Sequence, residues 1–156
     1  MNRFWAIICL LLSHGLYLEA QEKDESLLSK HHLQERVLLI FASSKDQAEL
    51  QQQLKNLNDY PSDLMQRKLL IYTVFPENGI APSGKHLRAE EAQKLYKQFM
   101  PNSKGFAIIF IDLDGLEQWR SKQPVSAREL FEFIDATALR RAEMLDSLIE
   151  SLGGSY

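Results

Sequence analysis

The sequence has a single cysteine among its 156 residues, Cys9, and that cysteine lies in a segment typical of those removed during export. Without it the mature chain has no thiol, which excludes disulfides, a cysteine nucleophile and thiolate metal ligands. A peroxidase that uses a peroxidatic cysteine is excluded for the same reason. The mature chain must therefore be stabilised by its core, and about 130 residues bury enough apolar surface for that.

Long hydrophobic runs are also missing, because the run at residues 4–12 is too short to cross a bilayer and no later segment approaches the necessary length. Arg3 precedes this run, and a less hydrophobic stretch that ends in Ala20 follows it. This pattern is typical of a secretory signal peptide. We expect residues 1–20 to be removed by cleavage after Ala20, with Gly15 as the alternative site. The mature chain is then secreted or periplasmic and has no transmembrane segment.

A strong net charge is absent as well, since the formal net charge is −3 at pH 7. This balance gives no reason to expect nucleic acid or an anionic membrane as a partner. The composition, 45% hydrophobic and 25% charged, is ordinary for one globular domain. We place a polar leader at residues 21–35, the domain at 36–144, and the end of a C-terminal helix with its tail at 145–156.

The first half of the domain shows the hydrophobic pattern of a βαβ unit. Continuous apolar runs at residues 37–41 and 69–74 predict strands that are buried on both faces. Between them, Leu50, Leu54 and Leu57 are spaced as on one face of a helix. Because a helix connects the two strands, the crossover requires them to be parallel.

The second half predicts a helix and then a ββα unit. Residues 75–87 are rich in proline and glycine and predict an irregular loop, and an amphipathic helix follows before Pro101. Two apolar runs joined by Asp-Gly at 114–115 predict a hairpin, and Ser126 with Glu129 predicts a capping box for a third helix. The order βαβ, α, ββα predicts an α/β, thioredoxin-like fold with a mixed four-stranded sheet flanked by helices.

The chain after Asp135 has further apolar residues at helical spacing. They are Leu139, Ala142, Leu145, Leu148, Ile149 and Leu152. This segment is either a continuation of the third helix that packs on the body or a partly exposed helix that binds a partner.

Ser43, Ser44, Lys45 and Asp46 lie between the first strand and its helix, where a thioredoxin-type redox site has its cysteines. A thiol at such a helix N-terminus has a lowered pKa, whereas a serine hydroxyl is a poor nucleophile without a base. Ser44 and Gln47, three residues apart, predict a capping box for the helix. The alternatives are a ligand or anion bound at the helix N-terminus with help from Lys45, and a serine-based catalytic site.

Three arginines form the most basic feature of the sequence. Arg120 ends the fourth predicted strand, and Arg140 and Arg141 are adjacent in the C-terminal segment. One interpretation is that they are solvated charges, or form fixed salt bridges that tie the C-terminal segment to the sheet. The other is that they form a patch that recognises an anion or a partner.

Other polar residues indicate no metal site, and we expect no cofactor. His31, His32 and His86 lack further ligands at suitable spacing, so we expect them to be solvated. Asp112 and Asp114 lack the downstream oxygen ligands of a calcium loop and fit a turn better.

Four segments in order, RVLLIFA, FAIIFIDLDGLEQWRS, PVSARELFEFID and LRRAEM, resemble the DUDES-type domain of unknown function. This domain occurs in small secreted bacterial proteins, in the vertebrate matrix proteins DRO/URB and in sushi-repeat proteins. The resemblance covers roughly residues 33–144, and it implies a thioredoxin-like fold related to peroxiredoxins, without a thiol site. Thr137-Ala138 stands where the family commonly has Met-Pro, which leaves the helix break expected there open. Asp112-Leu113 replaces Gly-Lys and argues against anion binding at the hairpin turn.

The sequence has no catalytic constellation, which favours an exported, non-enzymatic binding or structural module. Its partner is then a protein or a small ligand in the cell envelope or outside the cell. The alternative is an enzyme of the thioredoxin or peroxiredoxin class whose site does not need cysteine. Such a site would use Ser43, Ser44 and Asp46 beside Arg120 or Arg140, and it requires those side chains to converge in one concave pocket.

Overall fold

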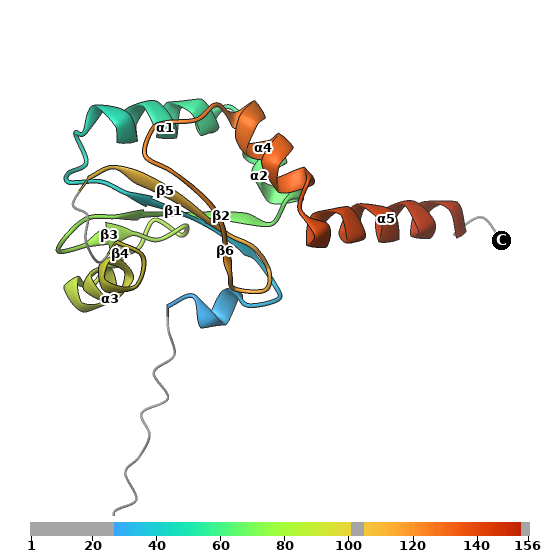
Figure 1. Ribbon diagram of the computed structural model, residues 1–156, viewed down its shortest axis with the longest axis horizontal. Coiled ribbons are helices and arrows are strands. Elements are labelled where there is room, and N and C mark those ends of the chain that lie inside the picture. The colour runs from blue at the N-terminus through green and yellow to red at the C-terminus, as the bar shows by residue number, and fades with distance from the viewer. Residues whose placement is uncertain (1–26, 101–104, 154–156) are drawn as a thin grey trace, which may run out of the picture.

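The computed structural model describes residues 27–100 and 105–153, and at its centre is a mixed six-stranded sheet with the order β4-β3-β2-β1-β5-β6 (Figure 1). The strands are β1 (Arg36–Phe41), β2 (Leu69–Val74), β3 (Gly79–Ile80), β4 (His86–Leu87), β5 (Ala107–Ile111) and β6 (Glu117–Ser121). The helices are the 3₁₀ turn η2 (Ser29–His31), α1 (Ala48–Asn58), α2 (Pro61–Gln66), α3 (Ala89–Phe99), α4 (Ala127–Asp135) and α5 (Ala138–Gly153). The expected signal peptide and Pro101 lie outside the described residues.

The centre of the sheet confirms the predicted βαβ and hairpin units. β1 pairs in parallel with β2 and antiparallel with β5, and β5 pairs antiparallel with β6. The hairpin turns at Gly115, whose φ of 77° lies in the left-handed region that glycine adopts readily. Ser126 and Glu129 form the predicted capping box at the start of α4.

The prediction of four strands is wrong, because the segment expected to be an irregular loop contains β3 and β4. These short strands extend the sheet beyond β2 through the antiparallel pairs Thr73–Ile80 and Gly79–Leu87. A side chain at Gly79 would meet the Thr73 carbonyl oxygen at 2.6 Å, so the close pairing of β3 with β2 requires glycine there. Strands of two residues are too short to leave a period-2 pattern in a sequence.

Helices cover both faces of the sheet, and each face has its own core (Figure 1). Leu38 and Ile40 of β1 pack on one face with residues of α1 and α4. Val37 and Leu39, which alternate with them, pack on the other face with residues of α3. Burying a side chain of this size contributes roughly 1.5–3 kcal/mol, so these two layers provide most of the stability of the fold.

The described part of the predicted polar leader packs against the sheet. Leu33 N–H donates to the Leu113 carbonyl at 2.7 Å. His31 is buried, with Nε2 2.7 Å from Tyr72 Oη and Nδ1 hydrogen-bonded to the Glu35 carboxylate. The prediction that His31 is solvated is therefore wrong, because η2 turns this side chain into the sheet. His32 and His86 are exposed, as expected.

Candidate functional site

The serine loop, residues 43–46, follows the carboxyl end of β1 and is exposed throughout. The predicted capping box of Ser44 and Gln47 is wrong, because α1 begins only at Ala48 and Gln47 is itself the N-cap residue. The longer side chain of Gln47 folds back, and its Oε1 accepts from Ser43 N at 2.7 Å and from Ser43 Oγ at 3.0 Å. The loop therefore closes on itself ahead of the helix.

An open cleft of about 550 Å³ lies beside the serine loop. Its lining residues are Ser43, Ser44, Lys45, Phe75, Pro76, Glu77, Asn78, Ile80 and His86. The cleft lies where the parallel strands β1 and β2 end, which is where open α/β sheets commonly bind ligands. A serine nucleophile needs a base within hydrogen-bond reach. Ser43 Oγ instead donates to the amide oxygen of Gln47, which is not a base.

Of the three candidate arginines, Arg120 lies on β6, whereas Arg140 and Arg141 are consecutive residues of α5. Arg120, on β6, forms an ion pair with Glu117 and donates to the Phe99 carbonyl at the end of α3. The hydrogen bond with Glu117 holds the pKa of Arg120 above its ordinary value. Arg140 is buried and Arg141 is exposed on α5.

The arginine at the root of α5 and the serine loop lie at opposite ends of β1. Arg140 shares the Glu143 carboxylate with Arg36, the first residue of β1, whereas Ser43 lies two residues after Phe41, the last residue of that strand. A six-residue strand spans about 20 Å. Arg140 therefore does not reach the serine loop, and the lining of the cleft beside that loop includes neither Arg120 nor Asp46.

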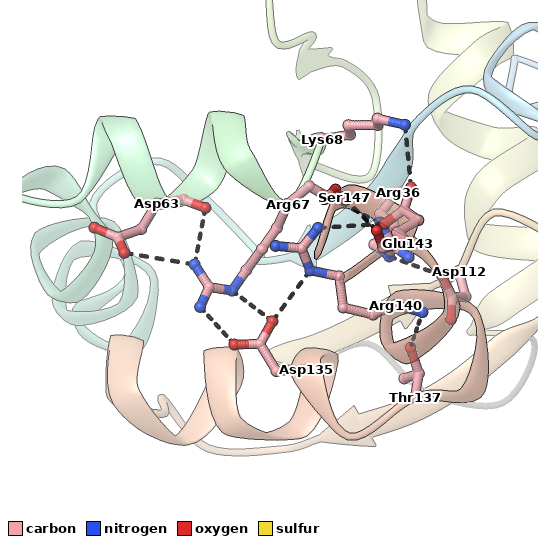
Figure 2. A network of polar contacts seen from close by, with 10 residues as sticks. All are labelled: Arg36, Asp63, Arg67, Lys68, Asp112, Asp135, Thr137, Arg140, Glu143 and Ser147. Carbon is pink, nitrogen blue, oxygen red and sulfur yellow. Dashed lines mark hydrogen bonds and ion pairs between the residues drawn. The ribbon is translucent and has the colours of Figure 1, made fainter. Parts of the chain in front are cut away.

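A network of ion pairs connects β1, the two residues before β2, α4 and α5 (Figure 2). At its centre, Arg36 is fully buried, with Nε 2.8 Å from Asp112 Oδ1 and Nη1 2.9 Å from Glu143 Oε2. Arg140 bridges the two helices, with Nε 3.3 Å from Asp135 Oδ1 and Nη1 3.4 Å from Glu143 Oε2. The network thus links the start of the central strand to the root of α5.

Two further cations complete this network, which we call the ionic network. Arg67 Nη2 lies 2.5 Å from Asp135 Oδ2, and Lys68 Nζ lies 3.1 Å from Glu143 Oε1. The guanidinium of Arg67 also lies over the ring of Phe131 at 4.4 Å. The members balance in charge: the cations are Arg36, Arg67, Lys68 and Arg140, and the anions are Asp63, Asp112, Asp135 and Glu143.

The charge balance of the ionic network favours the salt-bridge interpretation of Arg140. Burial alone raises the pKa of Glu143, but hydrogen bonds from Lys68 and Arg36 outweigh it and hold that pKa below its ordinary value. Each buried cation has a carboxylate beside it, which offsets the cost of removing both charges from water. Arg140 is therefore held in salt bridges that tie the C-terminal segment to the body, and recognition of an anion or a partner by Arg140 and Arg141 stays a prediction.

The ionic network holds only the root of α5, and the rest of the helix projects from the body (Figure 1). α4 ends at Asp135 and α5 begins at Ala138, so the helix does break even without a proline. At the start of α5, Arg140 N donates to Thr137 Oγ1 at 3.3 Å. Thr137 thus supplies a side-chain acceptor for a free backbone donor at the new helix start.

Beyond its root, α5 exposes a row of large apolar side chains, the α5 apolar face. They are Leu145, Leu148, Ile149 and Leu152, which are 57%, 59%, 59% and 78% exposed. Exposed apolar rows of this kind are uncommon in monomeric proteins and mark interaction sites. Of the two sequence interpretations, the exposed helix is the one that the structure supports.

Residues 27–100 and 105–153 contain neither a helix suited to crossing a membrane nor a cluster suited to holding a metal ion. None of the helices there combines the length and the apolar character needed to cross a membrane. In the same ranges no group of three histidine, cysteine or acidic side chains is placed to hold a metal ion.

Two solved structures show which proteins share the fold of this chain. It is similar to the reduced 2-Cys peroxiredoxin of Plasmodium vivax, with a TM-score of 0.54 and 16% identity over 75% of this chain and 84% of that one. It is also similar to thioredoxin peroxidase I of Plasmodium yoelii, with a TM-score of 0.55 and 17% identity over 75% and 79% of the two chains. At identities this low, the structural similarity establishes a shared thioredoxin-like fold and nothing about activity.

Among curated proteins, none matches the sequence significantly. Residues 27–143 match a family described as Domain of unknown function (DUF4174). This match agrees with the resemblance to a thioredoxin-like domain of unknown function seen in the sequence segments. Because it covers most of the chain, the protein belongs to the DUF4174 family.

Proposed function

We propose that this DUF4174 domain is an exported, non-enzymatic binding module that contacts a protein partner through the α5 apolar face. The observation that carries the proposal is the row of four large apolar side chains left in solvent on a helix whose root is fixed. Burying such a side chain contributes roughly 1–2 kcal/mol, so a partner that covers the row gains several kcal/mol.

The ionic network favours binding by fixing the direction of α5 before a partner arrives. Glu143, in the second turn of the helix, is held by Arg36 and Lys68, and Arg140 is held by Asp135. A recognition element that is already ordered loses less conformational entropy on binding than a flexible segment does. Because the guanidinium of Arg140 is already paired with Asp135 and Glu143, these contacts support a role for Arg140 in positioning α5.

The described residues show no group of reactive side chains gathered at one site, which favours binding over catalysis. The serines of the loop have no base hydrogen-bonded to them within the described part of the chain, and they lie at the other end of β1 from Arg140. The described residues contain no cysteine, so the thiol chemistry of a peroxidase has no group there to carry it. The pattern of residues 1–20 supports export.

Affinity capture tests this proposal. The full chain, carrying a C-terminal tag, is produced in an exporting host, recovered from the envelope or medium, and used to capture proteins that are identified by mass spectrometry. We expect a product that begins near residue 21, and a specific protein that Leu145→Glu/Ile149→Glu loses and Ser151→Glu retains. Ser151 lies on the same helix, away from the apolar face, and its substitution tests whether a new negative charge on α5 is enough by itself to prevent capture.

Two results would overturn the proposal. One is a set of captured proteins that does not change in the apolar-face variant. The other is turnover of a peroxide or a disulfide substrate by the purified chain, which would establish an enzyme. A product that remains in the cytoplasm with residues 1–20 attached would remove the export part alone.

A further inference from the structure

From the spacing and charges of α5 we infer that the protein partner on the α5 apolar face is a second copy of this chain, paired helix to helix in antiparallel orientation. The inference rests on the proposed function, because it names the occupant of the same surface. It makes the binding module a symmetric dimer whose two bodies lie at opposite ends of the helix pair.

The spacing of the apolar face suits pairing with its own copy. Leu145, Leu148 and Leu152 recur at steps of three and four residues, which is the seam of a two-helix coiled coil. If two α5 helices pair antiparallel about the point between Asp146 and Ser147, Leu145 of one copy lies beside Leu148 of the other. The same symmetry operation repeats the contact, so two layers of leucine form at the centre.

The exposed charges of α5 favour the antiparallel orientation. Arg141 lies in the first half of the helix, and Asp146 and Glu150 lie in the second half. No ion pair engages these three side chains within the described residues. In an antiparallel pair Arg141, which lies next to the apolar face, comes beside the last turn of the other helix, where free carbonyls provide negative charge. In a parallel pair, the two copies of Arg141 come side by side next to the seam, and their like charges repel.

The exposed area fits a weak dimer. Four side chains that are 57–78% exposed leave a patch on the order of 400 Å² per copy, which is large for one helix. With the flanking atoms of both helices, pairing buries about 1,000 Å² in total, at the low end for a specific interface. A dimer that forms at micromolar concentration and dissociates on dilution is the expected behaviour.

The projection and charge of α5 fit a protein partner better than a lipid surface. The helix has 16 residues and is therefore about 24 Å long, and it extends away from the sheet (Figure 1). Helices that lie on anionic membranes carry lysine and arginine on the polar face, whereas the outer turns of α5 carry Asp146 and Glu150.

Sedimentation of the exported full chain over a range of concentrations tests the dimer. We expect the weight-average mass to rise from one chain toward two between about 1 and 200 μM, in the range of weak interfaces. Leu145→Glu/Leu148→Glu should weaken association at least tenfold, whereas Ser151→Glu should leave it within twofold. Circular dichroism checks that all variants remain folded.

Oxidative cross-linking tests the orientation, with Cys9→Ser in every variant so that only one cysteine can react. In the antiparallel pair the two copies of residue 148 lie near the symmetry centre, so Leu148→Cys should cross-link. The two copies of residue 152 are offset by about 16 Å along the axis, too far for a disulfide, so Leu152→Cys should not. Cross-linking of both variants would indicate a parallel pair and overturn the inference.

The remaining outcomes separate this inference from the proposed function. A chain that stays monomeric at every concentration, yet captures another protein through α5, overturns the second copy as the occupant and leaves the binding module standing. Binding to vesicles of anionic phospholipid that Leu145→Glu/Leu148→Glu abolishes would identify a membrane and overturn both. A dimer that persists unchanged in that variant uses another surface and also overturns the inference.

Discussion

Arg36 and Glu143 are separated by 107 positions in the sequence, and Arg36 Nη1 donates to Glu143 Oε2 at 2.9 Å. One residue begins the central strand and the other lies in the second turn of the projecting helix. Glu143 also accepts from Lys68, so a single carboxylate joins α5 to β1 and to the residue before β2. This carboxylate is the main attachment of α5 to the sheet, and its removal gives the most direct test of the ionic network.

We predict that Glu143→Gln lowers the free energy of unfolding by about 2–3 kcal/mol, because it leaves the buried Arg36 with one carboxylate in place of two. Chemical denaturation with urea measures the change. Glu150→Gln, the same substitution at an exposed position of α5, should change stability by less than about 0.5 kcal/mol. Equal effects of the two substitutions would show that the buried location contributes nothing.

Acid stability should depend on the same carboxyl group. The pKa of Glu143 is lower in the folded chain than its ordinary value of 4.5, so the unfolded chain binds this proton more readily. The stabilisation is therefore complete above the ordinary pKa and is lost as the pH falls through the lower pKa of the folded state. Unfolding free energies measured from pH 7 to pH 3 should fall less steeply for Glu143→Gln than for the unchanged chain. A parallel decline would contradict this.

The hydroxyl of Tyr72 should lose its proton only at unusually high pH. Burial, with added effects of Glu35 and Glu91, raises the pKa of Tyr72 to about 12, so the folded chain retains this proton longer than the unfolded chain. The resulting stabilisation is complete below pH 10 and is lost as the pH rises toward 12. In a spectrophotometric titration of tyrosinate, Tyr72→Phe should remove a phase at high pH, and a titration that Tyr72→Phe leaves unchanged would contradict this prediction.

Replacing a buried leucine and replacing an exposed leucine should change the stability of the fold by very different amounts. Leu130 is 1% exposed within the α1–α4 core, so Leu130→Ala should destabilise the fold by about 2–4 kcal/mol. Leu148 is exposed on α5, so Leu148→Ala should change stability by less than about 0.5 kcal/mol. Urea denaturation at low protein concentration makes the comparison, because association would add apparent stability at high concentration. A large cost at Leu148 would mean that α5 packs on the body.

The sequence predicted the elements whose signals are local. β1 and β2 appear as continuous apolar runs, the β5–β6 turn as an Asp-Gly pair, and the start of α4 as a serine followed by a glutamate three residues later. Each of these patterns depends on neighbours within a few positions. The added strands β3 and β4 were missed because two residues give no periodicity.

The candidate site was harder to predict because its contacts are distant in sequence. Arg140 forms salt bridges, which were one of the alternatives open from the sequence. The other members of the network, Arg36, Arg67 and Asp135, were not recognised, because no sequence pattern shows which of these distant residues lie together. One available signal was the arginine directly before an apolar strand, where a charged residue is hard to bury alone. The loop at Ser43 was misread because Gln47 bonds to Ser43 rather than Ser44.

The position of Arg36 also has a consequence for how the sheet assembles. A strand with one polar face is aligned by that polarity, since a shift of one residue would expose its apolar side chains. β1 has no such guide, because residues 37–42 are apolar and buried on both sides. A slipped β1 would bury nearly the same hydrocarbon, but it would carry the guanidinium of Arg36 away from Asp112 and Glu143. The single charge at its start is what distinguishes the correct alignment of the central strand from its neighbours.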